Sequence, residues 1–116
     1  MNEFIGQANE EQSKEIELIK DIIVQTAAPL QIYLFGSYAY GEPNKDSDYD
    51  FYVVMPNDCD KENDYRSLIS RKIYMSNIRK AVDIIIHKRS YFEERNPLPS
   101  MERTILRKGI LLYDAG

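Results

Sequence analysis

Three aspartates lie in or beside apolar segments of the sequence that have the pattern of β-strands. Asp48 and Asp50 open the segment DYDFYVVM, and Asp83 lies inside AVDIIIH. Because strand side chains alternate between two faces, Asp48 and Asp50 point the same way, about 6.6 Å apart. A carboxylate in an apolar strand is costly to desolvate unless a cation or hydrogen bonds compensate its charge. If the two strands are neighbours, three carboxylates converge, and these hard oxygen ligands indicate Mg²⁺ or Mn²⁺.

A glycine and a serine upstream of the aspartates suit a phosphate group. Gly36 and Ser37 end the apolar segment QIYLF and open onto SYAYG, which reads as one turn of helix. A strand followed by glycine, serine and a helix start presents free backbone N–H groups and a hydroxyl to a phosphate. Glycine also lets the backbone approach closely. The sequence therefore predicts phosphate at Gly36 and Ser37, with metal ions at the aspartates in place of a phosphate-binding lysine.

Two well-known binding loops are each excluded by two positions. The glycine spacing matches the first half of a P-loop, but Glu42 and Pro43 stand where lysine and serine or threonine are required. The spacing of the acids matches the start of a calcium loop, but Phe51 replaces its glycine and Asn57 its bidentate glutamate. The remaining alternative is that the acids merely decorate a loop and a strand start. Their common face on an apolar strand weighs against that interpretation.

The elements around these residues alternate between helix and strand. A helix over 11–26 is predicted from helical spacing of isoleucines, with a cap at Asn9 and a stop at Pro29. A second amphipathic helix is predicted over 65–80, a short one after a capping box from Ser90 to Glu93, and another over 100–108. Strands are predicted over 31–35, 48–55, 81–87 and 110–114. The order favours a small α/β or α+β domain spanning 1–116, with a central mixed β-sheet flanked by helices.

Composition narrows the class of protein. The chain has 116 residues, 43% of them hydrophobic, and no apolar run approaches the roughly 20 residues that cross a bilayer. Its net charge of −4 makes a nucleic-acid backbone an unlikely main partner, since that binding needs clustered lysine and arginine. The acidic, polar N-terminus does not have the pattern of a signal peptide. Cys59 is the only cysteine and fits a reducing compartment, so we expect a cytoplasmic protein without membrane contact.

The motif residues together resemble a known family. Gly36-Ser37, ten further residues and then Asp48-Tyr49-Asp50, with VDIII later in the chain, resemble the signature of the nucleotidyltransferase superfamily typified by DNA polymerase beta. The short length is similar to a minimal nucleotidyltransferase (MNT) domain. The resemblance implies the polymerase beta-like fold. It also implies transfer of a nucleoside monophosphate from a nucleoside triphosphate to an acceptor, with release of pyrophosphate and with ATP as the expected donor.

The resemblance also implies roles for single residues. Asp48 and Asp50 would ligate two Mg²⁺ ions, with Mn²⁺ as an alternative, and Asp83 would hold the ion nearer the acceptor and help to remove its proton. Gly36 and Ser37 would grip the distal phosphates of the nucleotide. All three aspartates are therefore expected catalytic and metal-binding residues.

The acceptor is left open by the sequence. Because the chain ends soon after the expected catalytic elements, acceptor recognition is expected from a second subunit, which could be another copy, or from a partner protein. Proteins of the MNT kind commonly pair with HEPN-domain toxins and act as antitoxins by adding AMP to the toxin. One alternative is a non-catalytic antitoxin that acts by contact. Another is a small-molecule nucleotidyltransferase, although those usually carry an extra domain for the acceptor.

Several other residues are open to two interpretations. Tyr38 and Tyr40 could pack, stack on a base or receive a nucleotide, and Tyr40 stands where many relatives carry a basic residue. His87 is expected at a strand end, about 13 Å from Asp83. A basic face on the second long helix is expected to be solvated or to dock an acidic partner. Its residues are Arg66, Arg71, Lys72, Arg79 and Lys80.

Overall fold

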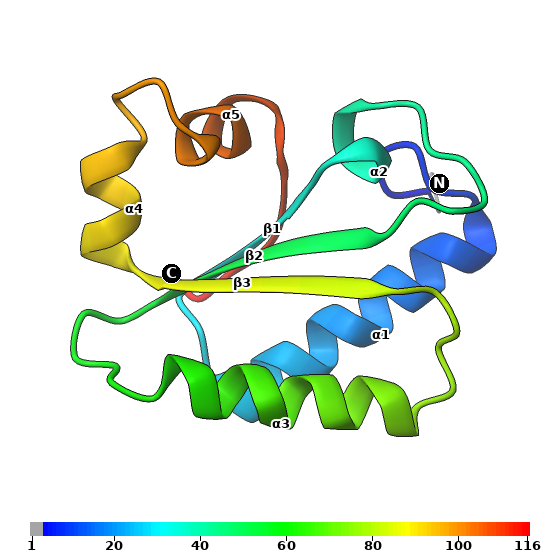
Figure 1. Cartoon of the computed structure of the whole chain (residues 1–116), viewed down its shortest axis with the longest axis horizontal. Helices are drawn as coiled ribbons and strands as arrows, with labels where there is room; N and C mark the ends of the chain where they lie inside the picture. Colours follow the sequence, from blue (N-terminus) through cyan, green and yellow to red (C-terminus); the bar gives the residue numbers. More distant parts are fainter. Residues whose placement is uncertain (1–3) are drawn as a thin grey trace.

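The computed structural model describes residues 4–116. It contains one four-stranded β-sheet with helices on both faces (Figure 1). The strands are β1 (Gln31–Phe35), β2 (Tyr49–Met55), β3 (Val82–Lys88) and β4 (Ile110–Asp114). The helices are α1 (Glu10–Ala27), α2 (Ser37–Tyr40), α3 (Glu62–Met75), α4 (Arg89–Arg95) and α5 (Met101–Lys108). No helix in residues 4–116 is long and apolar enough to cross a membrane.

The strand order in the sheet is β3-β2-β1-β4. Strand β1 is antiparallel to both of its neighbours, whereas β2 and β3 are parallel. Parallel strands need a long connection, and α3 provides it by crossing one face of the sheet between β2 and β3. The predicted mixed sheet is confirmed, and the two strands that carry the aspartates are neighbours, which is the condition under which their carboxylates converge.

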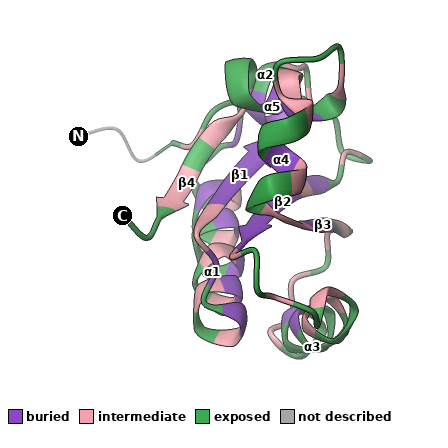
Figure 2. Ribbon diagram, turned by 90° about the vertical axis from the view of Figure 1, so that its left-hand side faces the viewer, coloured by how far each residue is buried: buried purple, intermediate pink, exposed green. Residues whose placement is uncertain are grey.

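The two faces of the sheet bury two separate apolar clusters (Figure 2). On one face, α1 and α3 pack against Phe51, Val53 and neighbouring residues of the sheet. On the other face, Tyr52 and Val54 pack with residues of α4 and α5. This alternation along β2 agrees with the predicted faces. It places Asp50 on the face that α4 and α5 cover, because Asp50 is two residues from Tyr52.

Helix α1 begins and ends as its sequence predicts. Asn9 accepts a hydrogen bond from the backbone of Gln12, and the Gln12 side chain accepts one from the backbone of Asn9, which completes a capping box. At the other end Ala28 adopts a left-handed conformation (φ 48°), one residue before Pro29, which cannot continue a helix.

The predicted helix over 65–80 is present, but its bounds differ from those predicted. Helix α3 begins three residues earlier, at Glu62, and ends at Met75, because Ser76 caps it and Asn77 has a left-handed backbone (φ 67°). Ile78 therefore lies outside the helix. Of the apolar residues in α3, Ile69 and Ile73 are buried, but Leu68 and Met75 are exposed. The helical spacing of apolar residues continues beyond Met75 into the connection to β3, although the helix itself ends there.

The predicted capping box at Ser90 was also wrong. Helix α4 begins at Arg89, its N-cap Lys88 makes no side-chain cap, and the backbone N–H of Ser90 donates to the side chain of Asn57. The helix itself is present where it was predicted. At α5 the predicted start is correct within one residue, since Ser100 is the N-cap and accepts a hydrogen bond from the backbone of Arg103.

Candidate active site

The register of β2 and β3 brings the predicted carboxylates together. Asp50 and Asp83 are directly paired across the parallel strands, and Asp48 immediately precedes β2. In Figure 1 the starts of β2 and β3 lie side by side, near the short helix α2. Both Asp48 and Asp83 are exposed, whereas Asp50 is half-buried. The three residues that the sequence singled out therefore have adjacent backbone positions, two of them in paired strands and one directly before β2.

The electrostatics of Asp50 reflect this crowding. Burial raises the pKa of its carboxyl group from the ordinary value of 3.8 to about 6, with further contributions from the charges of Asp83 and then Asp48. Within residues 4–116, no side chain donates a hydrogen bond to this carboxylate or pairs with it. The site therefore concentrates negative charge without any compensating group from the described chain.

Gly36 lies directly against Asp50. Phe35, the last residue of β1, is paired with Asp50, and Gly36 follows with a φ of +76°, which L side chains rarely adopt. A Cβ atom on Gly36 would collide with the Asp50 carboxylate. The chain then turns into α2, with Gly36 as its N-cap, so that Ser37 opens the helix as predicted. Gly36 and Ser37 thus border the carboxylates on the side of β1.

The two tyrosines of α2 differ in their surroundings. Tyr38 is almost completely buried, its ring centroid lies 5.0 Å from that of Tyr49, and its hydroxyl accepts a weak hydrogen bond from Gln12. It is a packing residue. Tyr40 is 39% exposed and belongs to neither apolar cluster. Of the two, Tyr40 alone has the accessibility that contact with a ligand requires.

The donor chemistry fits a hard divalent cation, but the side chains are not arranged around one. In the described part of the chain, no group of three or more His, Cys, Asp or Glu side chains is arranged to hold a metal ion. Asp48, Asp50 and Asp83 are all oxygen donors, and their backbone positions are adjacent. Three like charges without a cation repel one another, which opposes a close approach of the carboxylates. The residues therefore fit the metal in donor type and in backbone position, and binding would require their carboxylates to come together around it.

Lys80 is hydrogen-bonded to the segment that leads to Asp48, and the sequence did not predict this contact. It was placed on a solvated helix face, but it lies in the connection between α3 and β3 and donates hydrogen bonds to the backbone oxygens of Ser47 (3.0 Å) and Lys45 (3.4 Å). Arg79 and Lys80 lie outside α3, so the predicted basic face is not a face of one helix. Within α3, Arg66 donates to the backbone oxygen of Ile84, and Lys72 to the hydroxyl of Thr26. The only sequence signal for Lys80 was its position three residues before Asp83.

His87 lies at the other end of β3, as expected. Its ring stacks on that of Tyr91 at 3.7 Å between centroids, and the guanidinium carbon of Arg95 lies 3.5 Å from the centre of the Tyr91 ring. Burial lowers the pKa of His87. This stack is four residues along the strand from Asp83, so it is not part of the carboxylate cluster.

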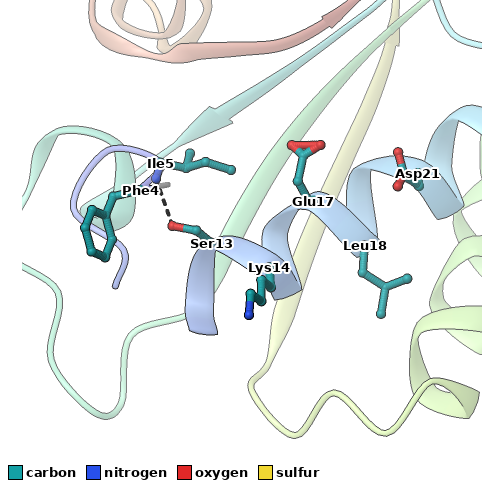
Figure 3. A pocket seen from close by; sticks show the side chains of 7 residues that line it. All are labelled: Phe4, Ile5, Ser13, Lys14, Glu17, Leu18 and Asp21. Atoms are coloured by element: carbon teal, nitrogen blue, oxygen red, sulfur yellow. Dashed lines mark hydrogen bonds between the residues drawn. The ribbon is translucent and has the colours of Figure 1, made fainter. Parts of the chain in front are cut away.

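A hollow along α1 is separate from these residues (Figure 3). It lies where the N-terminal segment meets α1, and the backbone N–H of Ile5 donates a hydrogen bond to Ser13 beside it. Its lining residues are Phe4, Ile5, Ser13, Lys14, Glu17, Leu18 and Asp21. Because α1 packs on the sheet face opposite to Asp50, this hollow cannot hold a ligand of the carboxylates.

Comparisons with known proteins agree with the fold. The family model described as polymerase beta nucleotidyltransferase matches residues 17–115. No curated protein is similar enough in sequence to count as a relative. A crystal structure of a provisionally assigned nucleotidyltransferase from Sulfolobus solfataricus is similar at a TM-score of 0.57, with 20% sequence identity over 88% of this chain and 79% of that one.

Two further similar structures come from toxin–antitoxin complexes. One is a toxin–antitoxin crystallised with AMP-PNP, with a TM-score of 0.54 and 25% identity over 87% of this chain and 73% of that one. The other is a mutant of the toxin–antitoxin MntA–HpeT, in which two aspartates two positions apart are changed to glutamate. It has a TM-score of 0.54 and 23% identity over the same shares of the two chains.

Proposed function

The chain belongs to the polymerase beta nucleotidyltransferase family, and on that premise we propose that it transfers AMP from ATP to a partner protein. It is a nucleotidyltransferase, and the family fixes the class of reaction. The donor, the acceptor and the residues that act are the proposed part. The observation that carries the proposed residues is the pairing of Asp50 with Asp83, with Asp48 directly before β2, next to the strand–glycine–serine–helix turn at Gly36.

The proposed reaction is an in-line displacement at the α-phosphorus of ATP. An oxygen atom of the acceptor forms a bond to the α-phosphorus as the bond from that phosphorus to the bridging oxygen of the β-phosphate breaks. Pyrophosphate leaves, and the acceptor oxygen loses its proton. When bound, two divalent cations such as Mg²⁺ would supply the charge that activates the attacking oxygen and stabilises the leaving pyrophosphate.

The chain's own residues have distinct proposed roles in this reaction. Asp48 and Asp50 would hold both cations. Asp83, paired with Asp50 and exposed to solvent, would hold the cation nearer the acceptor and accept the proton of the attacking oxygen. The raised pKa of Asp50 supports a cation at this place, because a positive charge would favour the ionised carboxylate that its surroundings disfavour. Gly36 and Ser37 would hold the distal phosphates with backbone N–H groups and a hydroxyl.

The nature of the acceptor is proposed from the similar structures. A toxin–antitoxin complex with AMP-PNP supports an ATP-like donor and a protein partner. The paired aspartates changed in the MntA–HpeT mutant have the spacing of Asp48 and Asp50. We therefore propose that this chain is the antitoxin of a pair and modifies its toxin, which the family resemblance implies would be a HEPN-domain protein.

The test is transfer of label from α-labelled ATP to the protein encoded by the adjacent gene, in the presence of Mg²⁺. We expect Asp48→Asn/Asp50→Asn to lower the rate by about 100-fold or more, since metal-held charge contributes several kcal/mol to such reactions. The matched control is Asp58→Asn/Asp60→Asn, which removes the same two charges at the same spacing from an exposed connector. This control should keep the full rate.

The same variants separate catalysis from neutralisation by contact. If the toxin is neutralised equally well by Asp48→Asn/Asp50→Asn and by the unaltered protein, and no label is transferred by either, the chain acts by binding and the proposed reaction is wrong. Loss of both label transfer and neutralisation in that variant alone would support the enzymatic role.

A further inference from the structure

Lys80 bridges the segments that carry the candidate catalytic residues. It is located two residues before β3, and its ammonium group donates hydrogen bonds to the backbone oxygens of Ser47 at 3.0 Å and Lys45 at 3.4 Å. Ser47 immediately precedes Asp48, and Lys80 is three residues from Asp83. One side chain thus connects the approach to β2 with the approach to β3, the two strands whose starts lie together in Figure 1.

The same ammonium group lies over two buried aromatic rings. Its Nζ atom is 5.4 Å from the ring centre of Tyr38 and 5.7 Å from that of Tyr49. These distances are within the range of cation–π attraction. Tyr38 follows Ser37, and Tyr49 lies between Asp48 and Asp50. Lys80 therefore contacts residues adjacent to both the proposed phosphate-binding turn and the proposed metal ligands.

The turn that leads to Asp48 is hydrogen-bonded to the connection before β3 through Lys80. Within 42–47, Asn44 and Ser47 bond to each other, and Asp46 bonds to the side chain of Asn44. In the described chain, the hydrogen bonds from Lys80 are the only ones that join this turn to another element. The first bond of the strand itself, from Tyr49 N–H to the oxygen of Ala81, begins after Asp48. Asp48 thus lies between a self-contained turn and the start of the ladder.

We propose that Lys80 is a positioning residue, which fixes the turn over 42–47 and so holds Asp48 beside Asp50 and Asp83. This inference rests on the proposed function, because Asp48 matters only if the carboxylates act together. Lys80 is not a ligand of the nucleotide in this proposal: two of its three N–H donors are used by backbone oxygens. Its effect should appear in the rate of the chemical step and in the metal requirement, and not in the affinity for ATP.

The experiment compares three lysine variants in the label-transfer assay. Lys80→Met keeps the length and apolar stem of the side chain but removes the ammonium group, and Lys80→Arg keeps the charge and the donors. Lys72→Met is the control, because the Lys72 ammonium group likewise donates a hydrogen bond to a distant part of the chain, to Thr26 at 3.1 Å, away from the site. For each variant, kcat, the KM for ATP and the Mg²⁺ concentration at half-maximal rate are measured, together with the melting temperature.

We expect Lys80→Met to lower kcat by about 10- to 100-fold, with less than about a threefold change in the KM for ATP, because a misplaced ligand costs rate. The half-maximal Mg²⁺ concentration should rise several-fold. Lys80→Arg should recover most of the rate, and Lys72→Met should behave as the unaltered protein. A change in the KM for ATP alone would overturn the proposal in favour of a phosphate-binding lysine.

Hydrogen exchange gives a second readout that needs no activity. Measured well below the melting temperature, the amides of 42–48 should exchange faster in Lys80→Met than in the unaltered protein or in Lys72→Met. Unchanged exchange would overturn the inference. If Asp50→Asn abolishes transfer while Lys80→Met has normal kcat, the inference about Lys80 alone fails. If Asp50→Asn transfers label normally, the proposed function fails with it.

Discussion

The missing side chain of Gly36 is what makes room for the carboxylate of Asp50. The glycine follows the β1 residue that is paired with Asp50, its φ is +76°, and a Cβ atom there would collide with an oxygen of that carboxylate. Gly36 was predicted from the sequence to let a phosphate approach the backbone. Its contact with Asp50 is a second, structural reason for a glycine at this position. Any larger residue would displace the acid at the centre of the site.

This relationship predicts coupling between substitutions at the two positions. Gly36→Ala should destabilise the fold through both backbone strain and the collision, by about 2 kcal/mol or more. In an Asp50→Ala background the collision is absent, so the same substitution should cost about 1 kcal/mol less. A double-mutant cycle by urea unfolding measures the difference. Additive effects, within about 0.5 kcal/mol, would show that the two residues do not constrain each other.

Removing the charge of Asp50 should stabilise the protein in the absence of metal. The pKa of Asp50 in the folded protein, about 6, exceeds the ordinary value of 3.8. The contribution of this carboxyl group to the free energy of unfolding is therefore fully present below about pH 4, where it is protonated, and is lost as pH rises through 6. At pH 7 Asp50→Asn should raise the free energy of unfolding by about 1 kcal/mol, a discounted figure because the half-exposed carboxylate is screened by solvent.

The measurement for Asp50→Asn is chemical unfolding between pH 4 and pH 7 with a chelator present. The gain should be largest at pH 7 and smallest at pH 4. Asp58→Asn, at an exposed position of the connector after β2, is the control and should change little at either pH. A variant less stable than the unaltered protein at pH 7 would mean that the carboxylate is stabilised by its surroundings.

Metal and nucleotide should stabilise the fold together and not separately. Mg²⁺ keeps its hydration water unless several ligands replace it, and phosphate oxygens would complete the set that the three aspartates begin. At about tenfold excess over the dissociation constant of ATP, we expect a rise of about 4 °C in the melting temperature with Mg²⁺ present. ATP with chelator, or Mg²⁺ alone, should give no rise. A melting curve unchanged by the pair would contradict the site.

The buried hydrogen bond between Tyr52 and Glu102 should contribute to the stability of the fold and not to the reaction. Glu102 is only 6% exposed, and its carboxylate accepts a hydrogen bond of 2.8 Å from the hydroxyl of Tyr52. Tyr52→Phe would leave that buried acceptor without its donor and should cost about 1–3 kcal/mol of unfolding free energy. Tyr74→Phe, at a tyrosine that is 82% exposed, is the control. Equal stability of the two variants would show that the hydrogen bond contributes nothing.

Local sequence patterns predicted the elements of the site but not the contacts that fix it. The alternation along β2 and the position of Asp83 in an apolar strand were sufficient to predict that the carboxylates meet, once the strands proved to be neighbours. The end of α3 was missed because helical periodicity continued beyond Ser76 and Asn77, where the backbone changes. The role of Lys80 was missed because its acceptors are backbone oxygens 33 and 35 residues away, and no local pattern specifies those.

The most direct measurement is a crystal structure with Mn²⁺ and AMP-PNP, in which anomalous scattering locates the metal independently of any assumed ligands. We predict two anomalous peaks between the carboxylates of Asp48, Asp50 and Asp83, with the triphosphate against Gly36 and Ser37. Metal and nucleotide bound elsewhere, or Asp83 turned away from the peaks, would contradict the account of this site.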